Sequence, residues 1–272
     1  MVQQQRKKIR RNSSPGAHHP NWLWGEQSVL ETLEAGRWRV YELFAVSEVA
    51  ELHSDLFQSK QKEGTELAVV STARLTELVE TTEHQGIVAR VSKYPYESFE
   101  NFETSLQANP VASNGLPLKP MVVVIDRVQD TFLFAAILRC CGQTGVTGVI
   151  VGKHCQAQVT PQISRASLGA VNHFPIVQSD DLMQAVQKIK GLGFQLVASD
   201  PKSEQLLDQA RLSGGTALLI GSDLHSLDPL LLELCDRRLS IQKDGRVPSL
   251  HSAVAAGIFL YEIRRLQRNS VE

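Results

Sequence analysis

The sequence has little net charge, few cysteines and no long apolar run, and each shortage argues against a class of protein. It contains 28 Lys and Arg against 29 Asp and Glu among 272 residues, with a pI near 6.7, so no overall basic field indicates a nucleic-acid partner. No run approaches the roughly 20 apolar residues that span a bilayer, and the first 20 residues lack the apolar segment of a secretion signal. We therefore expect a cytoplasmic protein without membrane association.

The four cysteines show no C-x-x-C spacing and no zinc pattern, which is typical of a reducing compartment. Cys140 and Cys141 lie in an apolar helical run, where burial is the expected role. Asp223, His225 and His251 lie in loops near one another, but they lack the spacing of a metal motif and are interpreted as surface residues. The sequence predicts no metal site.

Glycine-rich nucleotide motifs are also missing, because neither G-x-G-x-x-G nor G-x-x-x-x-G-K-[ST] follows the first apolar strand. Ordinary dinucleotide and nucleoside triphosphate binding are thus disfavoured. A basic run, RKKIRR at residues 6–11, does stand out, and turn formers follow it. Residues 1–20 are predicted to form a disordered tail, either simply solvated or contacting RNA phosphates.

Residues 21–92 alternate helical and strand patterns and predict a small α/β domain, with segments EQSVLETLEAG, YELFAV, ELAVV and HQGIVARV. Residues 93–119 turn polar and proline-bearing and are predicted to be a linker. Arg90 and Lys93, at the end of the small domain, either contact RNA phosphates or border a solvated edge.

Residues 120–270 contain continuous apolar runs separated by helical patterns, namely MVVVI, GVIV, FQLVAS and ALLIGS. Strands buried on both faces by helices indicate a parallel sheet. Ligands of such sheets bind beyond the carboxyl ends of the strands, so the loops after MVVVI, ALLIGS and RLSI are the expected site. The final run SAVAAGIFLYEIRRLQ has helical spacing typical of core packing, with dimerisation as a second role for another face.

Three segments together resemble the SpoU/TrmH family (SPOUT class) of RNA ribose 2′-O-methyltransferases: VVVIDRVQDTFLFAAILRCCGQTGVTGVIV, ALLIGSDLHSLDPLLLELCDRRLSI and VPSLHSAVAAGIFLYEIRRLQ. The segments WGEQSVLETLEAG and HQGIVARV are similar to the start and end of the family's substrate-binding domain. The likeness runs from Trp24 to Gln267 and is greatest to the bacterial enzymes that methylate a guanosine of 23S ribosomal RNA.

This resemblance implies an α/β protein with a trefoil-knotted, parallel-sheet C-terminal domain and a small L30e-like domain that binds RNA. It implies S-adenosylmethionine as cofactor, large-subunit ribosomal RNA as substrate, and a homodimer formed through the knotted domain, whose active sites use both subunits. On the family's motifs, Gly221, Ile241 and Leu250 match cofactor-binding positions. Arg139 and Ser249 match positions beside the reacting ribose.

Several polar positions of the family's motifs are replaced in this chain. Leu133 and Ala135 stand where the family has asparagine and glycine, Asp223 and Leu224 where it has glutamate and glycine, and His251 where it has asparagine. Two hypotheses follow. The chain is an RNA 2′-O-methyltransferase that uses Arg139 and Ser249, with His251 replacing the amide, or it is a catalytically silent relative that binds RNA.

Overall fold

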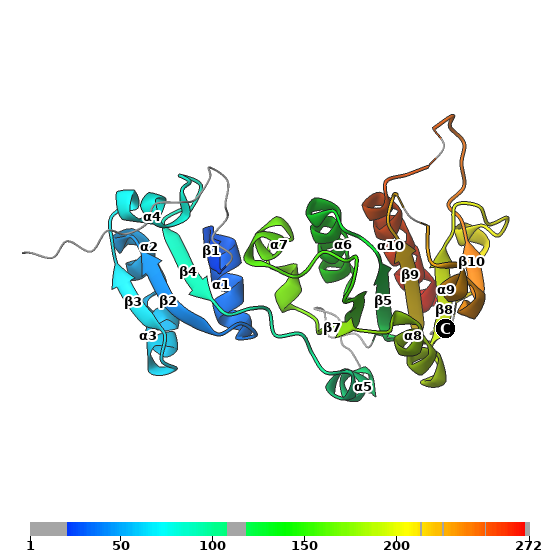
Figure 1. Cartoon of the computed structure of the whole chain (residues 1–272), viewed down its shortest axis with the longest axis horizontal. Helices are drawn as coiled ribbons and strands as arrows, with labels where there is room; N and C mark the ends of the chain where they lie inside the picture. Colours follow the sequence, from blue (N-terminus) through cyan, green and yellow to red (C-terminus); the bar gives the residue numbers. More distant parts are fainter. Residues whose placement is uncertain (1–20, 108–117, 213, 225, 248, 270–272) are drawn as a thin grey trace, which may run out of the picture.

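The computed structural model describes residues 21–107, 118–212, 214–224, 226–247 and 249–269. The predicted tail at 1–20 and His225 lie outside these ranges. Two sheets, one in each half of the chain, form two lobes side by side (Figure 1). Across the described ranges, no helix combines the length and the apolar character needed to cross a membrane.

The N-terminal sheet has four strands in the order β1-β4-β2-β3, with β2 and β3 parallel and the other pairs antiparallel. Its strands are β1 Trp22–Trp24, β2 Val40–Ala45, β3 Glu66–Val69 and β4 Ile87–Val91, and its helices are α1 Glu26–Ala35, α2 Ser47–Leu52, α3 Ser54–Lys62 and α4 Thr72–Val79. The predicted strands are confirmed. Helix α1 ends at Gly36, whose φ of 63° favours a residue without a Cβ.

The C-terminal sheet has six strands, all parallel, in the order β10-β8-β9-β5-β6-β7. Their bounds are β5 Met121–Asp126, β6 Gly148–Gly152, β7 Ile176–Ser179, β8 Gln195–Ser199, β9 Thr216–Gly221 and β10 Arg237–Leu239. The predicted parallel sheet is therefore confirmed. The chain adds β6 and β7 on one side of β5 and then places β8, β9 and β10 on the other side of β5. The strand order therefore reverses beside β5, and parallel sheets bind their ligands at such a point.

Helices cover both faces of this sheet: α5 Phe99–Gln107, α6 Thr131–Thr144, α7 Pro161–Ala166, α8 Leu182–Gly191, α9 Pro229–Leu234 and α10 Ser252–Asn269. Alternate residues of β5 serve the two faces. Val123 belongs to a core with Phe134 of α6 and Phe259 of α10, whereas Val124 belongs to a second core with Phe102 of α5. Because both faces are buried, the strand is apolar at nearly every position.

The segment predicted as a linker, 93–119, contains helix α5. Phe102 is fully buried, and a methyl group added at Gly148 of β6 would lie 2.1 Å from its ring. The backbone N–H of Glu97 also donates to the carbonyl of Ile176, at 2.9 Å. This part of the segment thus packs on the C-terminal sheet, while residues 108–117 lie outside the described ranges.

The two lobes meet through polar contacts centred on Asn172, which is 4% exposed. Its side-chain oxygen accepts from Nε1 of Trp38 at 3.0 Å, and its amide nitrogen donates to Oγ1 of Thr32 at 3.1 Å. Its backbone carbonyl accepts from Nε of Arg37 at 2.8 Å. Buried and mutually satisfied polar groups specify one geometry, so these bonds set the orientation of the small domain.

Candidate functional site

A cavity of about 600 Å³ lies beyond the carboxyl ends of β8, β9 and β10. The loops that follow these strands and the first residues of α10 supply most of its lining, including residues 199–201, 220–223, 239–245 and 249–252. Its volume falls in the range of roughly 300–1,000 Å³ that is usual for small-molecule and cofactor sites. Of the three loops expected to form the site, those after β9 and β10 line this cavity.

Four of the five predicted site residues line this cavity: Gly221, Ile241, Ser249 and Leu250. Gly221 is buried at the end of β9, Ile241 is half-buried just after β10, and the other two precede α10. The fold therefore brings the ends of two strands and the segment before α10 to one cavity.

Arg139 lies apart from the cavity, on α6. Its side chain is exposed, and it is not among the residues that line the cavity. The adjacent Cys140 contacts the carbonyl of Ala253 in the first turn of α10, with Sγ 3.9 Å from the oxygen. Arg139 thus lies near the start of α10 but on the outside of its own domain.

The apolar replacements in the family's motifs do not fill the cavity. Leu133 and Ala135 are 5% and 1% exposed, respectively, and belong to the core between α6 and the sheet. Leu224 is 89% exposed, so its side chain extends into solvent. Asp223 and His251, by contrast, both line the cavity.

Asp223 fixes the loop after β9 to the start of α10. One carboxylate oxygen accepts from the backbone N–H of Ser252 at 2.6 Å and from the Ser252 hydroxyl, and the other lies 3.1 Å from Nε2 of His251. A carboxylate that accepts from the first turn of a helix satisfies a free N–H group and interacts favourably with the helix dipole. The cavity wall is thereby closed at this corner by side chains from two loops.

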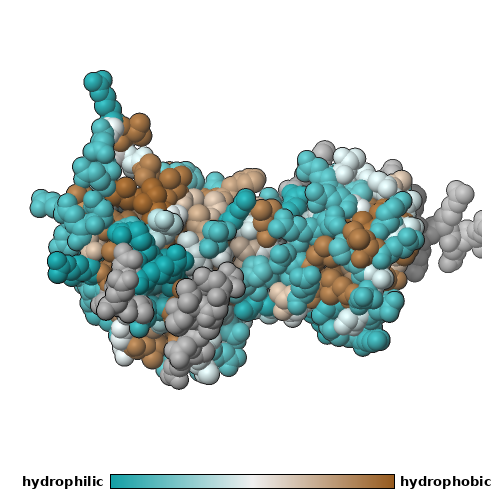
Figure 2. All heavy atoms as spheres, turned by 180° about the vertical axis from the view of Figure 1, so that it is seen from behind, coloured by the Kyte–Doolittle hydropathy of each residue, from teal (hydrophilic) through white to brown (hydrophobic). Residues whose placement is uncertain are grey.

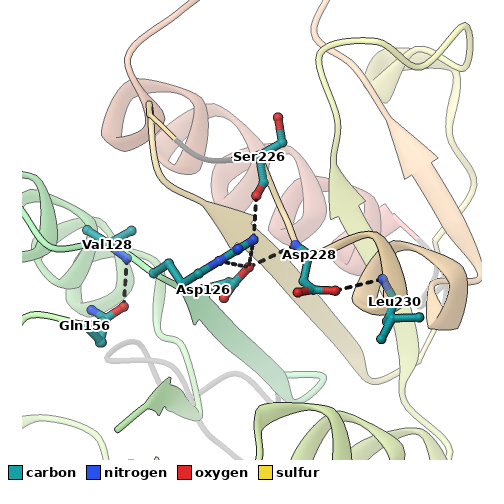
Figure 3. Close-up of polar contacts among 7 residues, drawn as sticks. Asp126, Val128, Gln156, Ser226, Asp228 and Leu230 are labelled. Carbon is teal, nitrogen blue, oxygen red and sulfur yellow. Dashed lines mark hydrogen bonds and ion pairs between the residues drawn. The ribbon is translucent and has the colours of Figure 1, made fainter. Parts of the chain in front are cut away.

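A second network holds the other end of the same loop (Figure 3). Asp126, 5% exposed at the end of β5, accepts from the backbone N–H of Asp228 at 3.0 Å and pairs with Arg127, also at 3.0 Å. Arg127 in turn donates to the carbonyl of Ser226 at 3.0 Å. Arg127 has a φ of 55°, a conformation that costs a non-glycine residue on the order of 1 kcal/mol. The contacts of its guanidinium hold it there and anchor the loop that lines the cavity.

Sequence reasoning gave no role to Asp126, Arg127, Asp200 or Ser252. Only Asp126 carried a signal, since a carboxylate directly after an apolar strand falls at the ligand-binding edge of a parallel sheet. Among the described residues, no group of three or more His, Cys, Asp or Glu side chains is placed to hold a metal ion.

A parallel α/β sheet with a ligand cavity at its carboxyl edge, joined to a small mixed-sheet domain, defines a class of two-domain ligand-binding proteins. Residues 120–261, more than half of the chain, match the model of the SpoU rRNA Methylase family, and residues 22–97 match the model for RNA 2′-O ribose methyltransferase substrate binding. The chain therefore belongs to the SpoU rRNA methylase family, and the resemblance inferred from its motifs is confirmed.

Individual proteins agree with the family match. The 23S rRNA (guanosine-2′-O-)-methyltransferase RlmB of Shewanella oneidensis is 29% identical over 248 residues, which cover 91% of this chain and 98% of that protein. An AdoMet-bound rRNA methyltransferase from Sinorhizobium meliloti superposes with a TM-score of 0.73 at 21% identity, covering 90% of this chain and 87% of the other.

The SpoU methyltransferase AviRb of Streptomyces viridochromogenes, solved in complex with AdoMet, gives a TM-score of 0.72 at 24% identity and covers 92% of this chain and 90% of its own. At these identities, the solved structures show a common fold. The predicted fold class, an α/β chain with a parallel-sheet methyltransferase domain, is thus confirmed.

Proposed function

We propose that this chain transfers a methyl group from S-adenosylmethionine to a ribose 2′-oxygen of RNA, with large-subunit ribosomal RNA as the substrate. The observation that carries the proposal is the cavity beyond β8, β9 and β10, which stays open although several motif positions are replaced. Family membership supplies the reaction class. Leu133 and Ala135 are buried in the core and Leu224 extends into solvent, so these three side chains do not close the cavity.

The chemistry of the cavity suits the methyl donor. Apolar side chains such as Leu239, Ile241 and Leu250 provide a surface for an adenine ring. Carboxylates at Asp200 and Asp223 provide negative charge for a cationic sulfonium. When bound there, the donor supplies an activated methyl group, while the residues of this chain position it and shield it from water.

A partly exposed arginine–tyrosine cluster on the small domain supports RNA binding. The guanidinium carbons of Arg39 and Arg90 lie 5.3 and 5.1 Å from the centre of the Tyr41 ring, and Arg90 also pairs with Glu42. Arginines on an aromatic side chain can contact both phosphates and unstacked bases. We place Arg90 and the nearby exposed Lys93 on the RNA-binding side of the small domain. We assign residues 21–92 to this RNA-binding domain, residues 93–119 to the linker and residues 120–270 to the methyltransferase domain.

A homodimer formed through the C-terminal domain is the second part of the proposal, together with a trefoil knot in that domain. Val254, Ile258 and Tyr261 are exposed on α10 at positions i, i+4 and i+7, so they share one face of the helix. Figure 2 shows apolar surface gathered on the C-terminal lobe at the base of its projecting loop. Because Arg139 lies outside its own cavity, we propose that it completes the cavity of a second copy.

The four free cysteines fit a reducing cytoplasm.

The first experiment is calorimetric titration with S-adenosylmethionine and with its demethylated product. We expect micromolar dissociation constants, that is, binding free energies near −8 kcal/mol. Ile241→Trp, which places an indole in the cavity, should abolish binding. Leu230→Trp, at an exposed site outside the cavity lining, is the matched control and should not. No heat at millimolar ligand would reject the cofactor site and favour the silent RNA-binding relative.

Transfer of a labelled methyl group to ribosomal RNA tests the reaction, and Arg139→Ala tests the shared site. We expect the variant to bind S-adenosylmethionine normally but to lose transfer by 100-fold or more, roughly the loss of a charge-stabilising group. Co-expressing Arg139→Ala with Ile241→Trp should restore about a quarter of the wild-type activity, because half of the dimers are mixed and each has one complete site. No restoration would reject a site built from two subunits.

A further inference from the structure

His251 and Asp223 form an imidazole–carboxylate pair at the edge of the cavity. Nε2 of His251 lies 3.1 Å from the carboxylate of Asp223, and both residues line the cavity. The His251 side chain is 56% exposed and that of Asp223 is 34% exposed, so the pair faces solvent from which a large substrate arrives.

The carboxylate is held in place from its other side. The backbone N–H and the hydroxyl of Ser252 both donate to the Asp223 oxygen that does not face the imidazole. With the carboxylate fixed, the neutral imidazole is favoured with its proton on Nε2, donating to Asp223. Nδ1 is then left unprotonated, with a lone pair able to accept a proton.

We infer that His251 is the base that takes the proton of the ribose 2′-hydroxyl, and that Asp223 is the positioning residue that orients its ring. This inference rests on the proposed function and assigns a role within it. A histidine oriented by a carboxylate is a recurrent arrangement for general base catalysis. An asparagine at position 251 could not do this, because a side-chain amide does not accept a proton near neutral pH.

The step balances in atoms and charge. His251 Nδ1 receives the hydroxyl proton while the 2′-oxygen forms a bond to the methyl carbon. The bond from that carbon to sulfur breaks, and its electron pair stays on sulfur, so the cationic sulfonium becomes a neutral thioether. The positive charge now resides on the imidazolium, where Asp223 stabilises it. Loss of the proton to water restores the base.

Charged groups of both signs accompany His251 in the cavity lining. Besides Asp223, the charged residues of the cavity lining are two carboxylates from separate loops and one lysine: Asp200, Asp244 and Lys243. Arg127, on the far side of the loop after β9, is already paired with Asp126. Carboxylates therefore outnumber cations among the residues that line the cavity.

The test compares His251→Asn, which installs an amide, with a matched control, His53→Asn. His53 Nε2 lies 3.1 Å from Glu26 inside the small domain, so it forms a similar pair outside the cavity lining. For His251→Asn we expect kcat to fall about 100- to 10,000-fold, the usual contribution of a general base, with the affinity for S-adenosylmethionine changed less than threefold. The wild-type rate should fall toward acid pH, whereas the residual rate of His251→Asn should not show this fall.

Nitrogen NMR gives a readout that does not depend on turnover. In the wild-type protein, neutral His251 should carry its proton on Nε2, and Asp223→Asn should weaken this preference while still accepting from the Ser252 N–H. If the wild-type protein transfers methyl groups and His251→Asn is equally active, His251 is not the base, but the proposed function stands. The same conclusion follows if the proton of neutral His251 is found on Nδ1. No methyl transfer by the wild-type protein would overturn both.

Discussion

Replacing Asn172 with alanine should loosen the small domain from the methyltransferase domain. The change removes two side-chain hydrogen bonds that cross between the lobes, to Trp38 and Thr32. Both partners are almost fully buried, at 3% and 1% exposed. The Thr32 hydroxyl can rotate toward a helix carbonyl, whereas the Trp38 indole N–H is fixed in direction and loses its acceptor.

The expected loss of stability follows from these two partners. A buried donor left without an acceptor costs roughly 1–3 kcal/mol, and the lost bond to Thr32 adds about 1 kcal/mol. We therefore expect Asn172→Ala to lower the free energy of unfolding of the small domain by about 2–4 kcal/mol. The effect should appear first as release of the domain, because these bonds join residues of two different lobes.

Tryptophan fluorescence during urea unfolding measures this directly, since all three tryptophans lie between residues 22 and 38. The matched control is Asn101→Ala, because Asn101 is exposed on α5 and its side chain donates from Nδ2 to Oε1 of nearby Glu97 at 2.9 Å. A surface change of this kind should cost less than about 0.5 kcal/mol. Equal urea midpoints for Asn172→Ala and Asn101→Ala would refute the reasoning. So would an unchanged kcat/KM for RNA in an Asn172→Ala protein whose small domain is released.

Three further outcomes follow from the same contacts. Asp126→Asn should weaken S-adenosylmethionine binding about tenfold in calorimetry, because it breaks a charged bond worth roughly 1.5–3 kcal/mol that anchors the cavity loop. Burial raises the pKa of Cys141 far above its usual range and that of Cys235 to about 12, so at pH 8 a thiol reagent should label exposed Cys155 first and the other two only on unfolding. Leu133→Asn should lower the free energy of unfolding by about 2–5 kcal/mol without raising activity, since it buries an amide in the core; a gain in turnover would contradict its placement there.

Much of the fold could be predicted because each element carries its own pattern. The run around Val123 and Val124 is apolar at consecutive positions, which indicates a strand covered on both faces, and the sheet is indeed parallel. Gly36 likewise predicted the end of α1, because glycine directly after a helical pattern is a local signal for a helix end. Strand β1 was missed because three residues are too few for a period of two to appear.

The site was only partly predictable. Gly221, Ile241, Ser249 and Leu250 were predicted through motif likeness, and they line one cavity, while their cofactor-binding and catalytic roles stay predictions. Nothing in the sequence pairs His251 with Asp223, because the two residues lie 28 positions apart in the chain and meet only through the packing of two loops. Their roles in catalysis remain predictions for the variants above.

By itself, the sequence determined the parallel sheet, the ends of several helices and the family, because apolar periodicity and motif spacing are properties of single segments. The tertiary structure decided what those segments do to one another. It packed α5, which lies in a mostly polar stretch, against the C-terminal sheet. It also turned Arg264 inward to donate to the carbonyls of Thr144 and Gly145 at the end of α6. Burial there lowers the pKa of Arg264 to about 10. Such contacts depend on where distant chain segments converge, and only the folded arrangement of the strands and helices brings them together.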